Sequence, residues 1–228
     1  MKKAIIILSI FALIAGGCKQ GNRKNQSLVA NSNNTNLTIM NKDAFWAIIE
    51  NAKNTNTEKM YSNLTKQMTK LSKEDVFRFR AYLVSYMELA NETIWIDMAC
   101  KVINGYVSDD TGLYFTLWLI AQGETVLLNA LKDPDTLAEL PEIPFGNADF
   151  EMLMAVGFDE DEDIDEVEAG NVFEKIMEEI TPSIQYKDGE KYGKYASFEE
   201  AMIEGIPNVL PKLIKRAALE QFDWINYI

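Results

Sequence analysis

The sequence predicts an all-α fold, in which a single helical domain follows a signal peptide and a flexible tether. Apolar residues recur at helical spacing through most of the chain after Asn41, which is the pattern of amphipathic helices. Hydrophobic residues make up 47% and charged residues 25% of the 228 residues, as in a globular domain with a sizeable core. We expect five segments: a signal peptide over 1–17, a tether over 18–40, a helical domain over 41–158, an acidic loop over 159–170, and a helical C-terminal extension over 171–228 that packs on the same domain.

The first 17 residues have the layout of a bacterial lipoprotein signal peptide. Lys2 and Lys3 precede an apolar stretch over 4–14, which is shorter than the roughly 20 residues of a membrane span. Small residues at 15–17 then lead into Cys18, as in a lipobox. We expect acyl chains on Cys18, palmitate among them, to anchor the protein in the cell envelope. A plain signal peptide or an uncleaved anchor is the alternative.

The residues that follow Cys18 indicate which membrane holds the protein and how the domain is joined to it. Lys19 stands where an Asp is associated with inner-membrane retention, which favours the outer membrane, facing the periplasm. Residues 19–38 are rich in Asn, Gln, Ser and Lys, and they have too few apolar side chains to offset the entropy of ordering. We therefore expect a flexible tether ahead of the helical domain.

Capping residues mark where the first helices begin. Asn41 is placed to cap a short helix that ends in the polar stretch 51–57. Ser72 is placed to cap a longer helix, with Leu71 and Val76 as a hydrophobic staple. The apolar stripe of this second helix, which begins at Val76, is expected to face the core.

Three further helices are predicted in the middle of the chain. The first spans 94–103 and ends at Gly105, a residue suited to the left-handed conformation at a helix end. From 113 to 131, apolar residues surround most of the helix circumference, which predicts one central buried helix that Pro134 ends. The pattern then loosens, and a third helix is expected over 150–158.

The C-terminal part is predicted as shorter helices after the acidic loop. One helix is expected over 172–180, and the segment 186–192 is compatible with a small β-hairpin around an Asp-Gly turn. Ser197 begins a capping-box sequence that opens a short helix, and Pro211 begins the last helix.

Composition argues against several classes of function. The chain has no histidine, which removes the commonest general base, the commonest zinc ligand and every Ser-His or Cys-His dyad. The formal net charge is -13, and it becomes -15 when cleavage of the signal peptide removes Lys2 and Lys3. Nucleic acid is therefore a poor candidate ligand. Cys100 lies in an apolar run and is expected to be a buried free thiol. No catalytic residue and no cofactor is predicted.

The negative charge is concentrated in one region. Between Asp133 and Glu179 there are seventeen Asp and Glu residues against one lysine, Lys175, a net charge of -16. The rest of the mature chain is nearly balanced. One face or loop of the domain is therefore expected to carry the negative field.

Several short motifs carry a family resemblance. They are Phe45-Trp46, Ser108-Asp109-Asp110, the WLIxQG motif at 118–123 and the DPDxLA motif at 133–138. In order and spacing they resemble the bacterial domain-of-unknown-function family 4240, over roughly 42–158. Two departures are Gly105-Tyr106-Val107, where the family tends to have Gly-Gly-Cys, and Phe115-Thr116-Leu117, where it tends to have Phe-Arg before the Trp. The resemblance implies the domain, and it implies no particular activity or cofactor.

The candidate ligand-binding residues are Ser108, Asp109, Asp110, Trp118 and Gln122. Two adjacent carboxylates at a helix start, with Gln122 about three turns further on, would suit a cation or an amine-bearing ligand. Capping of the helix by Ser108 and Asp109 is the interpretation we favour, because negative charge there also meets the helix dipole.

Tryptophan positions favour packing over ligand binding. Trp46, Trp95 and Trp118 all lie on helical apolar stripes. We expect their rings to lie in the core rather than to form a ligand platform.

The acidic run also raises the question of a calcium site. Its candidate ligands are Asp159, Asp161, Asp163 and Asp165. Neither register of an EF-hand loop fits, because Gly and Glu are missing at the positions that such a loop requires. A loose divalent-cation site, a docking surface for a basic partner and a solvated loop stay open, and we favour the solvated loop.

The function that we expect is non-catalytic binding at the cell envelope. The acidic region would dock a protein partner with a basic surface, in an immunity-type or adaptor role, while the lipid holds the chain on the membrane. The alternative is an enzyme or a metal-dependent small-ligand-binding protein that uses Asp109, Asp110 and Gln122. A structural spacer in a larger envelope complex is a third possibility.

Overall fold

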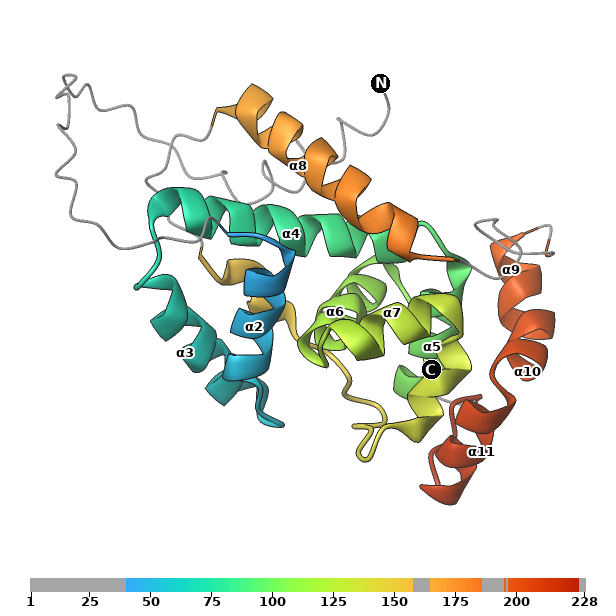
Figure 1. Cartoon of the computed structure of the whole chain (residues 1–228). Helices are drawn as coiled ribbons and strands as arrows, with labels where there is room; N and C mark the ends of the chain where they lie inside the picture. Colours follow the sequence, from blue (N-terminus) through green and yellow to red (C-terminus); the bar gives the residue numbers. More distant parts are fainter. Residues whose placement is uncertain (1–39, 158–164, 186–194, 196, 226–228) are drawn as a thin grey trace, which may run out of the picture.

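The computed structural model describes residues 40–157, 165–185, 195 and 197–225 (Figure 1). Within these ranges the fold is all-α and contains no strand, so the predicted fold class is confirmed. Helix α4 (Lys73–Asn91) lies at its centre. Helices α2 (Lys42–Ala52), α5 (Ile94–Asn104) and α6 (Asp109–Ala121) pack on one side of it, and α8 (Glu166–Ile180) packs on the other. The predicted hairpin over 186–192 and the signal and tether residues before Met40 lie outside the described residues. None of the described helices is long and apolar enough to cross a membrane.

The first two described helices are short and pack against each other. Helix α2 (Lys42–Ala52) is capped as predicted, because the Ala44 amide donates to the Asn41 side chain at 2.9 Å. Helix α3 (Thr57–Met68) was not predicted as a separate element. Its cap is Asn56, and it buries a narrow stripe of residues spaced four apart, Met60, Leu64 and Met68.

The chain enters the fold through a buried polar contact with α4. The amide of Met40 donates to Asp75 at 2.9 Å, and Asp75 is 8% exposed. Ser72 caps α4 as predicted, since its hydroxyl accepts from the Asp75 amide at 3.1 Å. The same hydroxyl donates to the Asp75 carboxylate at 2.7 Å, so this carboxylate joins the entry point to the first turn of α4.

Helix α4 is buried on more than the one predicted stripe. The buried set includes Phe79, Leu83 and Met87, and also Tyr82 and Leu89. The reason is α8 (Glu166–Ile180), which covers the outer side of α4 through its own apolar stripe (Figure 1). The hydroxyl of Tyr82 reaches across to Glu179 at 3.2 Å.

The single helix expected over 113–131 is wrong. The chain forms two helices, α6 (Asp109–Ala121) and α7 (Glu124–Lys132), which are separated at Gln122 and Gly123. Gly123 has φ 99° and ψ 166°, a conformation that is essentially restricted to glycine. Apolar residues dominate on both sides of this short polar break because both helices are partly or wholly buried, so the overall hydrophobicity of the segment did not mark it. The stop of α5 (Ile94–Asn104) at Gly105 is confirmed, with φ 84° there.

The segment after α7 is irregular and is fixed by polar contacts. It contains two 3₁₀ helices, η1 (Pro134–Glu139) and η2 (Glu151–Ala155), so the helix expected over 150–158 is a short 3₁₀ turn. The buried Asn104 side chain donates to the Ala148 carbonyl at 3.0 Å and accepts from the Ala148 amide at 2.8 Å. This pair of bonds holds the segment against the end of α5.

Helix α8 begins earlier than expected. Asp165 caps it by accepting from the amides of Val167 and Glu168 at 2.9 and 3.0 Å. The acidic loop expected over 159–170 is therefore helical from Glu166 onward, because acidic residues in the first turn favour the helix dipole.

The chain ends in a series of short helices. After η3 (Thr181–Ser183), the Ser197 cap is confirmed at 3.1 Å from the Glu200 amide, and it opens α9 (Phe198–Glu200). The rest consists of the π-helical turn η5 (Ala201–Gly205), α10 (Ile206–Val209) and α11 (Pro211–Leu219). Helix α11 packs against α5 and η1.

Candidate functional site

The Ser-Asp-Asp motif caps α6. The Ser108 hydroxyl accepts from the Thr111 amide at 3.2 Å, while Asp109 and Asp110 are exposed in the first turn. Gln122 is the C-cap at the opposite end of this 13-residue helix, roughly 20 Å away at 1.5 Å per residue. The capping interpretation therefore holds for Ser108, and the structure does not bring the two carboxylates together with Gln122.

The described residues contain no group of three or more side chains placed to hold a metal ion. Of the four acidic candidates, Asp165 is the cap of α8. Asp159, Asp161 and Asp163 lie outside the described residues.

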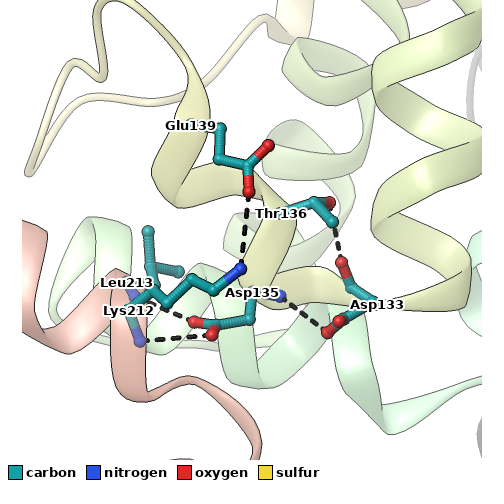
Figure 2. Close-up of polar contacts among 6 residues, drawn as sticks. All are labelled: Asp133, Asp135, Thr136, Glu139, Lys212 and Leu213. Atoms are coloured by element: carbon teal, nitrogen blue, oxygen red, sulfur yellow. Dashed lines mark hydrogen bonds and ion pairs between the residues drawn. The ribbon is translucent and has the colours of Figure 1, made fainter.

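The DPDxLA motif joins the body of the domain to its last helix (Figure 2). Asp135 is 4% exposed, and its carboxylate accepts from the amides of Leu213 at 2.9 Å and Lys212 at 3.2 Å. Leu210, which precedes α11, provides no capping side chain, so Asp135 caps α11 from a distant part of the sequence. Asp133 in turn accepts from the Asp135 amide at 3.3 Å, and Lys212 pairs with Glu139 at 3.4 Å.

Three residues of the WLIxQG segment, Trp118, Ala121 and Gln122, line a cleft of about 750 Å³. Four parts of the chain form this cleft: the α2–α3 connection with the start of α3, the C-terminal end of α6, Val126 of α7, and the irregular segment between η1 and η2. Trp118 and Gln122 belong to its lining. Two of the five candidate ligand-binding residues therefore share a cleft, and the other three do not contribute to it.

The floor of the cleft is apolar and its edge is polar. Trp118 is 5% exposed, and its ring stacks on Phe115 at 5.4 Å between centroids. Gln122 turns back along α6, where its side-chain amide donates to the Trp118 carbonyl at 3.1 Å. At the edge, the Lys53 ammonium donates to the Gln122 carbonyl at 2.7 Å and pairs with Glu50 at 3.5 Å.

Comparison with protein families agrees with this assignment of motifs. The model of a family described as "Protein of unknown function (DUF4240)" matches residues 40–163, which is more than half of the chain. The protein belongs to the DUF4240 family. No curated protein and no solved structure matches it.

The DUF4240 match ends before α8, so α8 and α11 lie beyond it although both pack on the matched region. The predicted resemblance over roughly 42–158 is thus confirmed and extends slightly at both ends. Two cleft residues, Lys53 and Glu142, were not singled out in the sequence. They lie in connections far apart along the chain, and no local spacing connects them.

The tryptophans of the helical stripes and the free cysteine belong to the core. Three of the four tryptophans, Trp46, Trp95 and Trp118, are 5%, 2% and 5% exposed, as predicted. Cys100 is fully buried, and burial together with the Asp97 carboxylate raises the pKa of its thiol to about 12. Because the thiolate is the reactive form, Cys100 is an inert part of the core.

Helix α8 presents an acidic surface. Its buried stripe consists of Ala169, Phe173, Ile176 and Ile180. The outer side carries five exposed carboxylates, which we call the acidic α8 face: Asp165, Glu166, Glu168, Glu174 and Glu178. Among the described residues, none of the four glutamates forms an ion pair.

Proposed function

We propose that this DUF4240 protein is a lipid-anchored protein of the cell envelope that binds a basic partner protein through the acidic α8 face. It works as a non-catalytic interaction module, and acyl chains on Cys18 hold it on the membrane, in the outer membrane facing the periplasm. Binding of the partner in this way would suit an immunity or adaptor protein.

The distribution of the acidic residues supports the proposal. Of the seventeen acidic residues between Asp133 and Glu179, those in η1 have internal partners, since Asp135 caps α11 and Glu139 pairs with Lys212. Four glutamates of α8 are exposed and form no ion pair among the described residues: Glu166, Glu168, Glu174 and Glu178. Glu179, in contrast, accepts a hydrogen bond from Tyr82 of α4. Lys175 is the one basic residue in the helix. Charges without an internal partner are the ones that steer and orient a basic partner.

The test replaces three charges on this face. Glu168→Gln, Glu174→Gln and Glu178→Gln are combined in the full-length protein, which is then crosslinked and purified from native membranes. We expect the basic proteins recovered with the wild type to be lost, as measured by quantitative mass spectrometry. A matched control combines Glu58→Gln, Glu199→Gln and Glu204→Gln, three exposed glutamates outside α8, and should retain them.

A second variant tests the rest of the acidic run. Neutralising Asp159, Asp161, Asp163 and Asp165 together should weaken the same association. If both acidic variants recover every partner at wild-type levels, docking through the acidic region is disproved.

The anchor is tested separately. Metabolic labelling with palmitate should mark the wild type and leave a Cys18→Ser variant unlabelled. The variant should also leave the membrane fraction, and unchanged membrane retention of it would contradict anchoring through Cys18.

The alternative, a ligand or metal site built from Asp109, Asp110 and Gln122, has less support. The two carboxylates lie at the opposite end of α6 from Gln122. A thermal melt with Ca²⁺, Mg²⁺ or Mn²⁺ and with EDTA tests it, because a ligand that binds the native state raises the melting temperature.

A further inference from the structure

The cleft at the C-terminal end of α6 has the properties of a small-ligand site. Its volume of about 750 Å³ lies within the range of clefts that bury small ligands. Three apolar residues of its lining, Met60, Ala121 and Phe150, are only 2% to 3% exposed and form its floor. Such a floor favours an apolar side chain or ring over a fully hydrated ion.

Trp118 adds an aromatic ring to the lining of the cleft. Its side chain is 5% exposed and stacks on Phe115 at 5.4 Å between ring centroids. A ring held in this way offers a rigid apolar surface to a ligand side chain.

The edge of the cleft carries one charge of each sign. The Lys53 ammonium has three N–H donors, of which the Gln122 carbonyl and Glu50 use two. Its side chain is 42% exposed, which leaves the third donor accessible. Glu142 is exposed on a different segment and has no ion pair or hydrogen bond among the described residues.

We propose that the cleft binds a small zwitterion with an apolar body, of the class of short hydrophobic peptides with free ends. The ligand carboxylate pairs with Lys53, its amino group pairs with Glu142, and an apolar side chain lies against Trp118. This is a second site, since it shares no residue with the acidic α8 face.

The test uses the dipeptide Leu-Phe as the probe, titrated calorimetrically into the full-length protein in detergent. We expect saturable binding that weakens about two- to fivefold when the amino end is acetylated, and by a similar factor when the carboxyl end is amidated. Each charge is then assigned by a double-mutant cycle. In the Glu142→Gln variant, acetylation of the amino end should no longer weaken binding, while amidation still does. In the Lys53→Gln variant, amidation of the carboxyl end should no longer weaken binding, while acetylation still does.

Matched controls keep the test specific to the cleft. Glu58→Gln and Lys59→Gln change exposed charges of the neighbouring helix. In these variants, both acetylation and amidation of the peptide should weaken binding as they do in the wild type. The tested side chains are exposed, and equal melting temperatures of all variants without peptide check that the fold is intact.

Two results would overturn the proposal. One is the absence of heat and of any melting shift with Leu-Phe at millimolar concentration. The other is binding that is indifferent to both end groups, or that is stronger for decanoate, which would make the cleft a site for apolar or anionic ligands. The triple glutamine variant of α8 should bind Leu-Phe normally, so failure of partner docking and failure of peptide binding are distinguished.

Discussion

At the scale of single residues, Asp135 is a buried carboxylate of the DPDxLA motif that holds the start of α11. Replacing it with Ala leaves the amides of Lys212 and Leu213 without their acceptor. We expect Asp135→Ala to lower the free energy of unfolding by about 2 kcal/mol, the cost of buried donors left unsatisfied and of a lost helix cap. Urea denaturation measures it.

The control for Asp135 is its neighbour Glu139. The ion pair between Glu139 and Lys212 is 70% and 62% exposed, so Glu139→Gln should cost less than about 0.5 kcal/mol. Equal costs for the two variants would show that Asp135 does not hold α11.

Cys100 predicts a loss of stability at alkaline pH. Its thiol has a pKa of about 12 in the folded protein against an ordinary value of 9.0, because burial disfavours the thiolate. Above pH 9 the unfolded chain releases this proton while the folded protein keeps it, so the free energy of unfolding falls as pH rises from 9 to 12. Burial likewise raises the pKa of Tyr82 to about 12.

Denaturation curves between pH 8 and about pH 11 test the thiol's part of this effect. The Cys100→Ala variant should be less stable at pH 8, because it leaves a small cavity, and should then lose stability less steeply than the wild type as pH rises. Parallel pH profiles of the two proteins would exclude the buried thiol as a cause.

At the scale of elements, two glycines provide a matched test of helix boundaries. At Gly123 a Cβ would meet Glu50 at 2.0 Å, and φ is +99°. Gly170 lies inside α8 with nothing within 4 Å of a new Cβ. We expect Gly123→Ala to destabilise by about 2 kcal/mol and Gly170→Ala to stabilise by about 0.5–1 kcal/mol. Thermal and urea unfolding measure both, and the same sign for both would contradict the assigned boundaries.

Helices with a clear cap were predictable from sequence, and breaks inside buried apolar segments were not. Asn41, Ser72 and Ser197 each fill the predicted capping role. The break at Gly123 was missed because apolar residues on both sides continue the helical pattern, and the glycine was the single local signal. The cleft was missed because Lys53 and Glu142 come to line one cleft only through the tertiary fold.

At the scale of the whole molecule, the region matched by the family model depends on the helices C-terminal to it. Helix α8 covers the outer side of α4, and α11 is capped by Asp135. A chain ended after residue 163 loses both contacts and exposes apolar residues of α4. We expect it to bind a hydrophobic dye and to unfold without a cooperative transition, as measured by fluorescence and thermal melting.

A chain ended after residue 183 distinguishes the two contacts. It retains α8 and lacks α11, so it should bind less dye than the shorter chain. Cooperative unfolding of the shorter chain at the wild-type temperature would mean that the matched region is an independent domain.

The entry of the chain at Met40 has a mechanical consequence. A pull on the residues before it, as from a membrane anchor, would reach the hydrogen bond between the Met40 amide and Asp75. Because Asp75 also bonds Ser72 at the start of α4, part of the load passes into the helix on which α2, α5, α6 and α8 pack. Tension transmitted from the proposed anchor would therefore act on α4 as well as on α2.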